Sequence, residues 1–118
     1  MAHRILIVED EPLIAMMIED FLDELGYQSA GTVDTVADAM ARVKSGEVDA
    51  AILDVNLRGG EKSWAIADAL DDADMPFLFA SGGEEASMPE RHRGRSVLIK
   101  PFTMDAIARA LDLLRAGQ

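Results

Sequence analysis

The chain has 118 residues, enough for one domain with a single hydrophobic core. Its formal charge is −11 and its pI is near 4.4, which argues against nucleic acid or an anionic membrane as a partner. The absence of cysteine excludes disulfides and thiolate metal sites, and it suits the reducing cytoplasm, where we expect the protein. The apolar run 5–8 is too short for a signal peptide or a membrane span.

The first half of the chain alternates between predicted strands and helices. An unbroken apolar run over 5–8 indicates a buried strand. Apolar residues at helical spacing then predict a helix over 12–26, which starts at a proline and ends at a glycine. A weak strand over 27–30 follows, and a second helix is capped by Asp34 or Thr35.

The second half continues this alternation. Apolar runs predict strands over 50–53, 77–80 and 97–99. Helical spacing predicts a third helix that stops before Met75, and a last helix that carries Met104 on its apolar face. The apolar face of the third helix consists of Ile66, Ala69, Leu70 and Ala73. Between the last two strands, glycines and a proline leave room only for a short or irregular fourth helix. Such alternation indicates an α/β fold, a parallel sheet with helices on both faces.

Polar residues stand where the predicted strands end. Glu9 and Asp10 follow the first strand, Asp54 the third, Ser81 the fourth and Lys100 the fifth. In an open parallel sheet these ends lie at one edge, where ligands bind. Taken alone, Asp54 would be interpreted as a loop residue or a helix cap. The acids that follow another strand favour a site instead.

The residue types at this edge indicate a chemistry. Crowded carboxylates repel one another by roughly 4 kcal/mol per pair at 4 Å and an effective dielectric of 20. A hard divalent cation relieves this repulsion, and Mg²⁺ prefers a few oxygen ligands with waters. A hydroxyl and an amine opposite the acids suit an incoming phosphoryl oxygen. The sequence therefore predicts magnesium-assisted phosphoryl chemistry on a carboxylate.

Several motifs follow one another along almost the whole chain. They are Ile-Leu-Ile-Val-Glu-Asp-Glu-Pro at 5–12, Asp-Val-Asn-Leu at 54–57, Ser81 and Lys-Pro-Phe at 100–102. This pattern resembles the receiver domain of bacterial two-component response regulators. Pro-Phe-Leu-Phe-Ala-Ser-Gly-Gly at 76–83 further resembles a receiver subgroup with Pro-Phe-x-Phe-Ala-Thr-Gly-Tyr, whose members often stand alone.

The resemblance implies a fold and a domain organisation. We expect a flavodoxin-like (βα)5 doubly wound parallel sheet with strand order 2-1-3-4-5. We also expect residues 1–118 to form one receiver domain without an output domain. Val97 stands where many receivers carry an aromatic switch residue, so the segment 82–95 is expected to carry the output signal instead.

The resemblance also assigns a role to each residue at the strand ends. Asp54 would be the phosphoacceptor, Asp10 a direct Mg²⁺ ligand, Glu9 a second acid acting on the metal through water, and Asn56 a metal ligand through its backbone carbonyl. Ser81 would bind a phosphoryl oxygen, Lys100 would pair with the phosphoryl group, and the Lys100–Pro101 bond would be cis. The residues two positions beyond Asp54 and Ser81 would tune the lifetime of the acyl phosphate; they are Asn56 and Gly83, and because Gly83 has no side chain the lifetime is left open.

The implied function is that of a switch. A sensor histidine kinase or a histidine phosphotransfer protein would donate the phosphoryl group to Asp54, and the modified domain would change its binding to a downstream protein target. Beyond Mg²⁺-dependent self-phosphorylation and self-dephosphorylation, we expect no enzymatic activity.

The same residues leave alternative functions open. A magnesium-dependent phosphohydrolase usually needs a second acid two residues beyond its nucleophile, where this chain has Asn56, and a cap for which there is no room. A receiver fold that serves as a constitutive interaction module is the other alternative, although the acids, the hydroxyl and the lysine are all present.

One cluster of basic residues lies late in the sequence. Arg91, His92, Arg93 and Arg95 could form a solvated loop or a partner-docking patch. His92 has no further ligand at metal-binding spacing, so we expect it at the surface. Trp64 is expected to cover the core beside the third helix.

Overall fold

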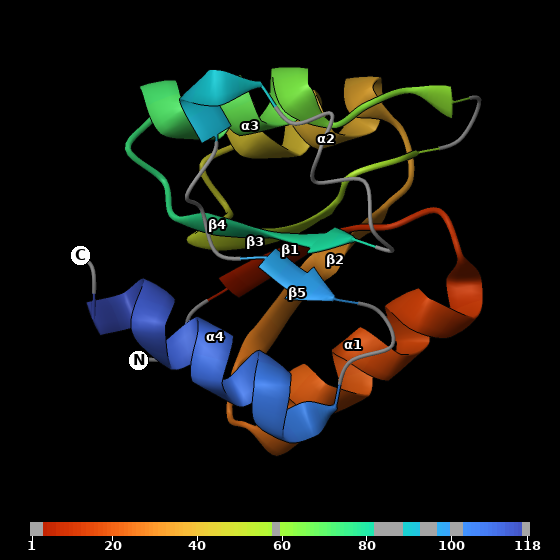
Figure 1. The fold of residues 1–118 in the computed structure, drawn as a ribbon, viewed down its shortest axis with the longest axis vertical. Coiled ribbons are helices and arrows are strands. Elements are labelled where there is room, and N and C mark those ends of the chain that lie inside the picture. Colours follow the sequence, from red (N-terminus) through yellow and green to blue (C-terminus); the bar gives the residue numbers. More distant parts are fainter. Residues whose placement is uncertain (1–3, 58–59, 82–88, 93–96, 100–102, 117–118) are drawn as a thin grey trace.

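The computed structural model contains one parallel sheet with the strand order β2-β1-β3-β4-β5 (Figure 1). The structure describes residues 4–57, 60–81, 89–92, 97–99 and 103–116. The strands are β1 (Arg4–Val8), β2 (Gln28–Val33), β3 (Ala50–Asp54), β4 (Phe77–Ser81) and β5 (Val97–Ile99). The helices are α1 (Pro12–Glu24), α2 (Val36–Lys44), α3 (Trp64–Asp72) and α4 (Met104–Ala116), with a 3-10 turn, η3 (Glu90–His92). This order confirms the predicted flavodoxin-like topology.

Hydrophobic clusters fill the layers on both sides of the sheet. Helices α2 and α3 cover one face, and α1 and α4 cover the other (Figure 1). Because side chains alternate along a strand, Leu53 of β3 packs with α2 and α3 while Ile52 packs with α1 and α4. Both faces of the central strands are therefore apolar, which explains why their sequences are unbroken apolar runs.

Local side-chain chemistry sets the ends of the helices. Pro12 lies in the first turn of α1, and Gly26 takes the left-handed conformation (φ 84°) just beyond its last turn. Of the predicted caps for α2, Thr35 is the one used. Its Oγ1 accepts a hydrogen bond from the backbone N–H of Asp38 at 3.1 Å.

Some predicted boundaries differ from the structure. Strand β2 continues to Val33, beyond the predicted end at Ala30, because Val8 of β1 pairs with Val33. Helix α3 begins at Trp64, and Ile66, the first residue of its predicted apolar face, lies within its first turn. Pairing with β1 therefore extends β2 beyond what its local apolar pattern indicates.

The predicted short or irregular fourth helix falls between β4 and β5. There the structure describes the turn η3, while 82–88 and 93–96 lie outside the described residues. Most of the segment 82–95, which was expected to carry the output signal, therefore lies outside them as well. Among the helices that the structure describes, none is long and apolar enough to cross a membrane.

The placement of α1 can be tested on its leucines. Leu22 is 0% exposed and Leu13 is 80% exposed. Replacing Leu22 with Ala should lower the free energy of unfolding by about 2–5 kcal/mol, because it removes a buried side chain and leaves a cavity. The same change at Leu13 should alter it by less than about 0.5 kcal/mol. Urea denaturation followed by circular dichroism measures both values, and equal losses would contradict this placement.

Candidate functional site

Three carboxylates meet where β1 and β3 end. In this parallel pair Val8 lies beside Leu53, so the residues that follow them, Glu9 and Asp54, also lie side by side. One carboxylate oxygen from each of Glu9, Asp10 and Asp54 lies within 4.8 Å of the others. The structure thus brings together the acids that the sequence placed at separate strand ends.

These acids are largely removed from water. Glu9 is 3% exposed and Asp54 is 5% exposed, while Asp10 is half-buried. The backbone N–H of Glu9 donates to the carbonyl oxygen of Val33 at 3.0 Å, and its Oε2 accepts a hydrogen bond from the N–H of Glu11 at 3.1 Å. Buried like charges at this spacing repel one another, so a cation would stabilise the site. Carboxylate oxygens are the donors that Mg²⁺ prefers, and these residues fit that ion.

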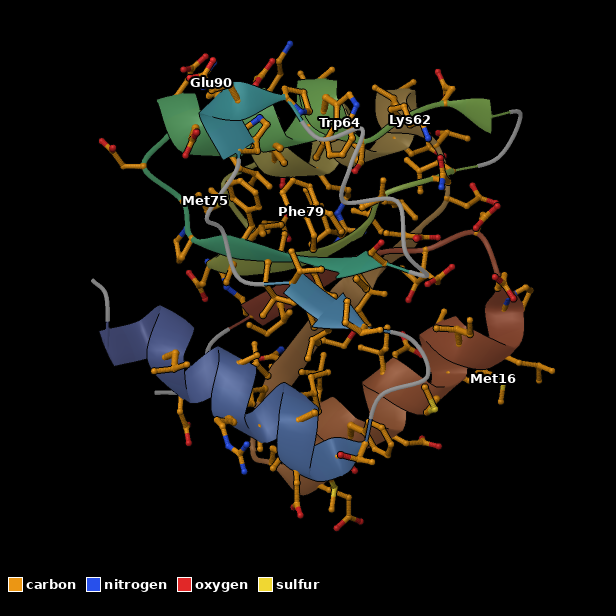
Figure 2. All side chains as sticks on the ribbon, in the orientation of Figure 1. Met16, Lys62, Trp64, Met75, Phe79 and Glu90 are labelled. Atoms are coloured by element: carbon orange, nitrogen blue, oxygen red, sulfur yellow. The ribbon has the colours of Figure 1, made fainter. Side chains whose placement is uncertain are left out.

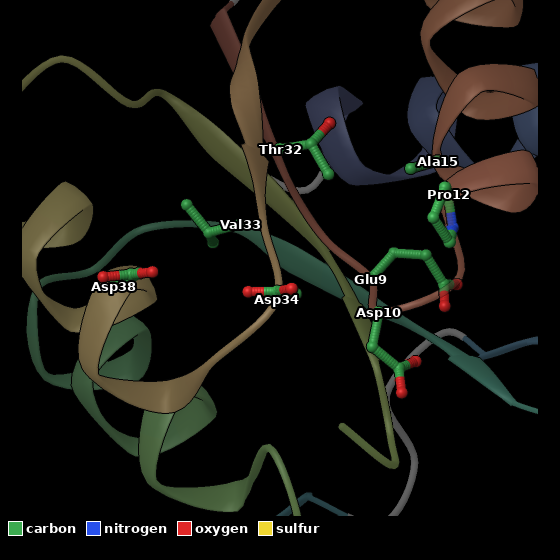
Figure 3. A pocket seen from close by; sticks show the side chains of 8 residues that line it. All are labelled: Glu9, Asp10, Pro12, Ala15, Thr32, Val33, Asp34 and Asp38. Carbon is green, nitrogen blue, oxygen red and sulfur yellow. The ribbon is translucent and has the colours of Figure 1, made fainter. Parts of the chain in front are cut away.

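A pocket opens beside the carboxylates, toward β2 and α2 (Figure 3). Glu9 and Asp10 line one side of it, and Thr32, Asp34 and Asp38 line the other. Because its polar lining consists mainly of carboxylates, the pocket extends the negative potential around the strand ends. The approach to the site therefore attracts cations.

Ser81 ends β4 next to Asp54. Ala80 pairs with Asp54 across the β3–β4 ladder, and Ser81 follows it directly. Ser81 is fully buried. The structure therefore places the predicted hydroxyl at the same sheet edge as the acids. Lys100 and Pro101, with the cis bond predicted between them, lie outside the described residues.

The loop that follows Asp54 is closed by hydrogen bonds. The N–H of Ser63 donates to the carbonyl oxygen of Val55 at 3.0 Å, and Nζ of Lys62 donates to the side-chain Oδ1 of Asn56. The predicted metal ligand of Asn56 is its backbone carbonyl oxygen, so the contact with Lys62 is compatible with that role. Nothing in the sequence indicated Lys62, because a loop lysine has no characteristic spacing.

The prediction that His92 lies at the surface is wrong. Its side chain is 0% exposed and packs among the rings of Trp64, Phe77 and Phe79. Its Nε2 lies 2.7 Å from Oδ1 of Asp68. The neighbours of His92 along the chain are charged, so the local pattern indicated exposure, whereas the rings that bury it come from α3 and β4. Trp64 packs against the core cluster under α3, as predicted.

Comparison with known proteins identifies the family. The model of the response regulator receiver domain matches residues 5–112, which include the ends of all the strands. This range contains the acids at the ends of β1 and β3, the serine that ends β4 and the lysine that follows β5. The match confirms the resemblance that the motifs indicated.

Several relatives align with nearly the whole chain. SdrG from Sphingomonas melonis Fr1 is 62% identical, and its solution structure matches over 97% of each chain with a TM-score of 0.87. A structure of the BeF3-activated conformation of SdrG matches with a TM-score of 0.81. Chemotaxis protein CheY from Bacillus subtilis is 27% identical over 95% of this chain and 97% of its own length. The transcriptional activator IrlR from Burkholderia pseudomallei is 33% identical over 98% of this chain, which spans 52% of that relative. The chain belongs to the family of response regulator receiver domains.

Proposed function

We propose that Asp54 is the phosphoacceptor of this receiver domain. Receiver domains are phosphorylated on aspartate in two-component signalling and act as switches rather than as metabolic enzymes. The observation that carries the proposal is the meeting of Glu9, Asp10 and Asp54 at one sheet edge. Among these acids, Asp54 is the one between the carboxylates that follow β1 and the hydroxyl of Ser81 on β4, because β3 lies between those strands.

The proposed transfer uses a small number of chemical groups from the protein. A P–O bond forms to a carboxylate oxygen of Asp54, and the P–N bond of a phosphohistidine on the donor breaks, leaving imidazole with the bonding electrons. Mg²⁺ held by Asp10, Asp54 and the backbone carbonyl of Asn56 would neutralise charge on the phosphoryl group.

Further groups would hold the phosphoryl group and the metal. The hydroxyl of Ser81 donates a hydrogen bond to a phosphoryl oxygen. Glu9 supports the metal, and on the sequence pattern Lys100 pairs with the phosphoryl group. Lys100 would thereby supply a fixed positive charge opposite the acids.

Histidine kinases phosphorylate receiver domains, and the donor for this chain is proposed to be a sensor histidine kinase or a histidine phosphotransfer protein. The phosphorylated form would change its affinity for a downstream protein target. The charge of −11 disfavours nucleic acid as that target, because phosphates would be repelled.

A phosphohydrolase with Asp54 as nucleophile is less well supported. Such an enzyme would place an acid at position 56 to protonate its leaving group. The residue there is Asn56, whose side-chain oxygen accepts a hydrogen bond from Lys62. An amide N–H is far too weak an acid to protonate a leaving group, which favours a phosphate that stays on Asp54 over rapid turnover.

Labelling with a small acyl-phosphate donor and Mg²⁺ tests the phosphoacceptor. One phosphoryl group per chain should appear on Asp54, in a base-labile bond. Asp54→Asn should abolish the label, since an amide oxygen is a poor nucleophile. Asp34→Asn is the matched control, because Asp34 lines the adjacent pocket but is not part of the carboxylate group, and it should retain the label. Mass spectrometry of intact and digested protein gives the stoichiometry and the position.

Other outcomes of this labelling identify the alternatives. Repeated turnover of varied phosphate esters would support the phosphohydrolase. Absence of any label on the wild-type chain would support a constitutive interaction module. A label on another residue that survives in Asp54→Asn would contradict the assignment of Asp54.

Magnesium should stabilise the fold through the same carboxylates. At about one hundred times its dissociation constant, a ligand that binds only the folded state raises the free energy of unfolding by about 2.7 kcal/mol. Asp10→Asn should lose most of this increase, because it removes a charged ligand, while Asp38→Asn at the far side of the pocket should keep it. Thermal unfolding with Mg²⁺ and with a chelator measures the effect. An equal response of both variants would argue against binding at the strand ends.

A further inference from the structure

His92 lies in a cage of aromatic rings on the side of the sheet that α2 and α3 cover. Its ring is stacked on Trp64, with centroids 6.5 Å apart and planes at 21°. It contacts Phe79 and Phe77 edge-on, at 5.9 Å and 6.0 Å. Figure 2 shows Trp64 and Phe79 in the layer between the sheet and α3, with Glu90 of η3 above. The turn η3 is therefore anchored into the core by its histidine.

Polar contacts with α3 complete this anchor. Nε2 of His92 lies 2.7 Å from Oδ1 of Asp68. The guanidinium of Arg91 contacts carboxylates along the same helix, Asp68 at 3.4 Å, Asp71 at 3.4 Å and Asp72 at 2.8 Å. These carboxylates raise the pKa of Arg91, chiefly through the hydrogen bond with Asp72. We call the group of His92, Asp68 and Trp64 the His92 clamp.

The His92 clamp contacts both α3, which follows the loop after Asp54, and β4, which ends next to Asp54. Trp64 is the first residue of α3, immediately after the loop that follows Asp54. Phe79 lies on β4 two positions before Ser81, and its ring meets Trp64 edge-on at 5.5 Å. A displacement of α3 or β4 at the site would therefore change the contacts of the His92 ring with Trp64 or Phe79.

The hydrogen bonding of the His92 clamp is also incomplete within the described residues. Nδ1 of His92 is buried, and within the described residues no hydrogen-bond partner reaches it. The nearest carboxylate oxygen, Oδ2 of Asp71, is 3.9 Å away. A buried polar atom without a hydrogen bond costs free energy, which lowers the net stability of the docked arrangement.

We propose that the His92 clamp stabilises the unphosphorylated arrangement of the domain and is released when Asp54 is phosphorylated. This rests on the proposed function of Asp54. An interaction that belongs to one of two states shifts their equilibrium toward that state. Loss of the clamp therefore favours the phosphorylated arrangement, and a phosphoryl mimic binds more tightly in proportion to the increased population of that arrangement.

Beryllium fluoride with Mg²⁺ is the probe for this experiment, since it activates the similar protein SdrG. Asp68→Ala removes the carboxylate that holds Nε2 of His92. Asp72→Ala is the matched control, because it lies on the same helix and contacts Arg91 but is not a contact of His92. Titration followed by Trp64 fluorescence should show binding at least about fivefold tighter for Asp68→Ala and unchanged binding for Asp72→Ala.

A second measurement uses the proteins without the mimic. The emission of Trp64 in Asp68→Ala should already lie shifted toward that of the wild-type protein saturated with beryllium fluoride, because the stacked ring of His92 has left it. Circular dichroism verifies that both variants are folded.

The outcomes separate the clamp from the phosphoacceptor. Equal or weaker binding by folded Asp68→Ala would overturn the clamp and leave Asp54 in place. Equal tightening in both variants would also overturn it, because charge on α3 would then be the cause. Failure of the wild-type protein to bind the mimic would instead overturn the function proposed for Asp54, and the clamp with it.

Discussion

The parallel register of β1 and β3 is the constraint on which the rest of this domain depends. Because Val8 lies beside Leu53, the acids that follow the two strands are held close together. The strands themselves are held by apolar packing on both faces, which is strong enough to keep the carboxylates together despite their repulsion. A fold that enforces this proximity creates a site that a bound cation would stabilise.

Much of the fold and of the carboxylate site could be predicted from the sequence. The apolar runs gave the strands, and the parallel topology then placed Glu9, Asp10 and Asp54 together because all strands end at one edge. The use of Thr35 rather than Asp34 as the cap of α2 could not be predicted, since both residue types are common caps and Asp is the more strongly preferred of the two. It depended on which side chain faced the N–H of Asp38 in the folded chain.

The burial of His92 could not be predicted for a different reason. Its charged neighbours along the chain indicated solvent, but burial is decided by residues far away in sequence, and here Trp64 and Phe79 surround the ring. The contact between Lys62 and Asn56 could not be predicted either, because it depends on how the loop after β3 closes. Local patterns predict elements, whereas contacts between elements require the fold.

The alternation of side chains along β3 has a consequence for the evolution of such a domain. Leu53 enters the apolar layer under α2 and α3, and Asp54 follows it at the strand end. Inserting or deleting a single residue within the strand would exchange the two faces, so that the carboxylate would be directed into aliphatic side chains. Lineages of this domain can therefore change loop lengths and helix surfaces freely, but the number of residues in the central strands must stay fixed.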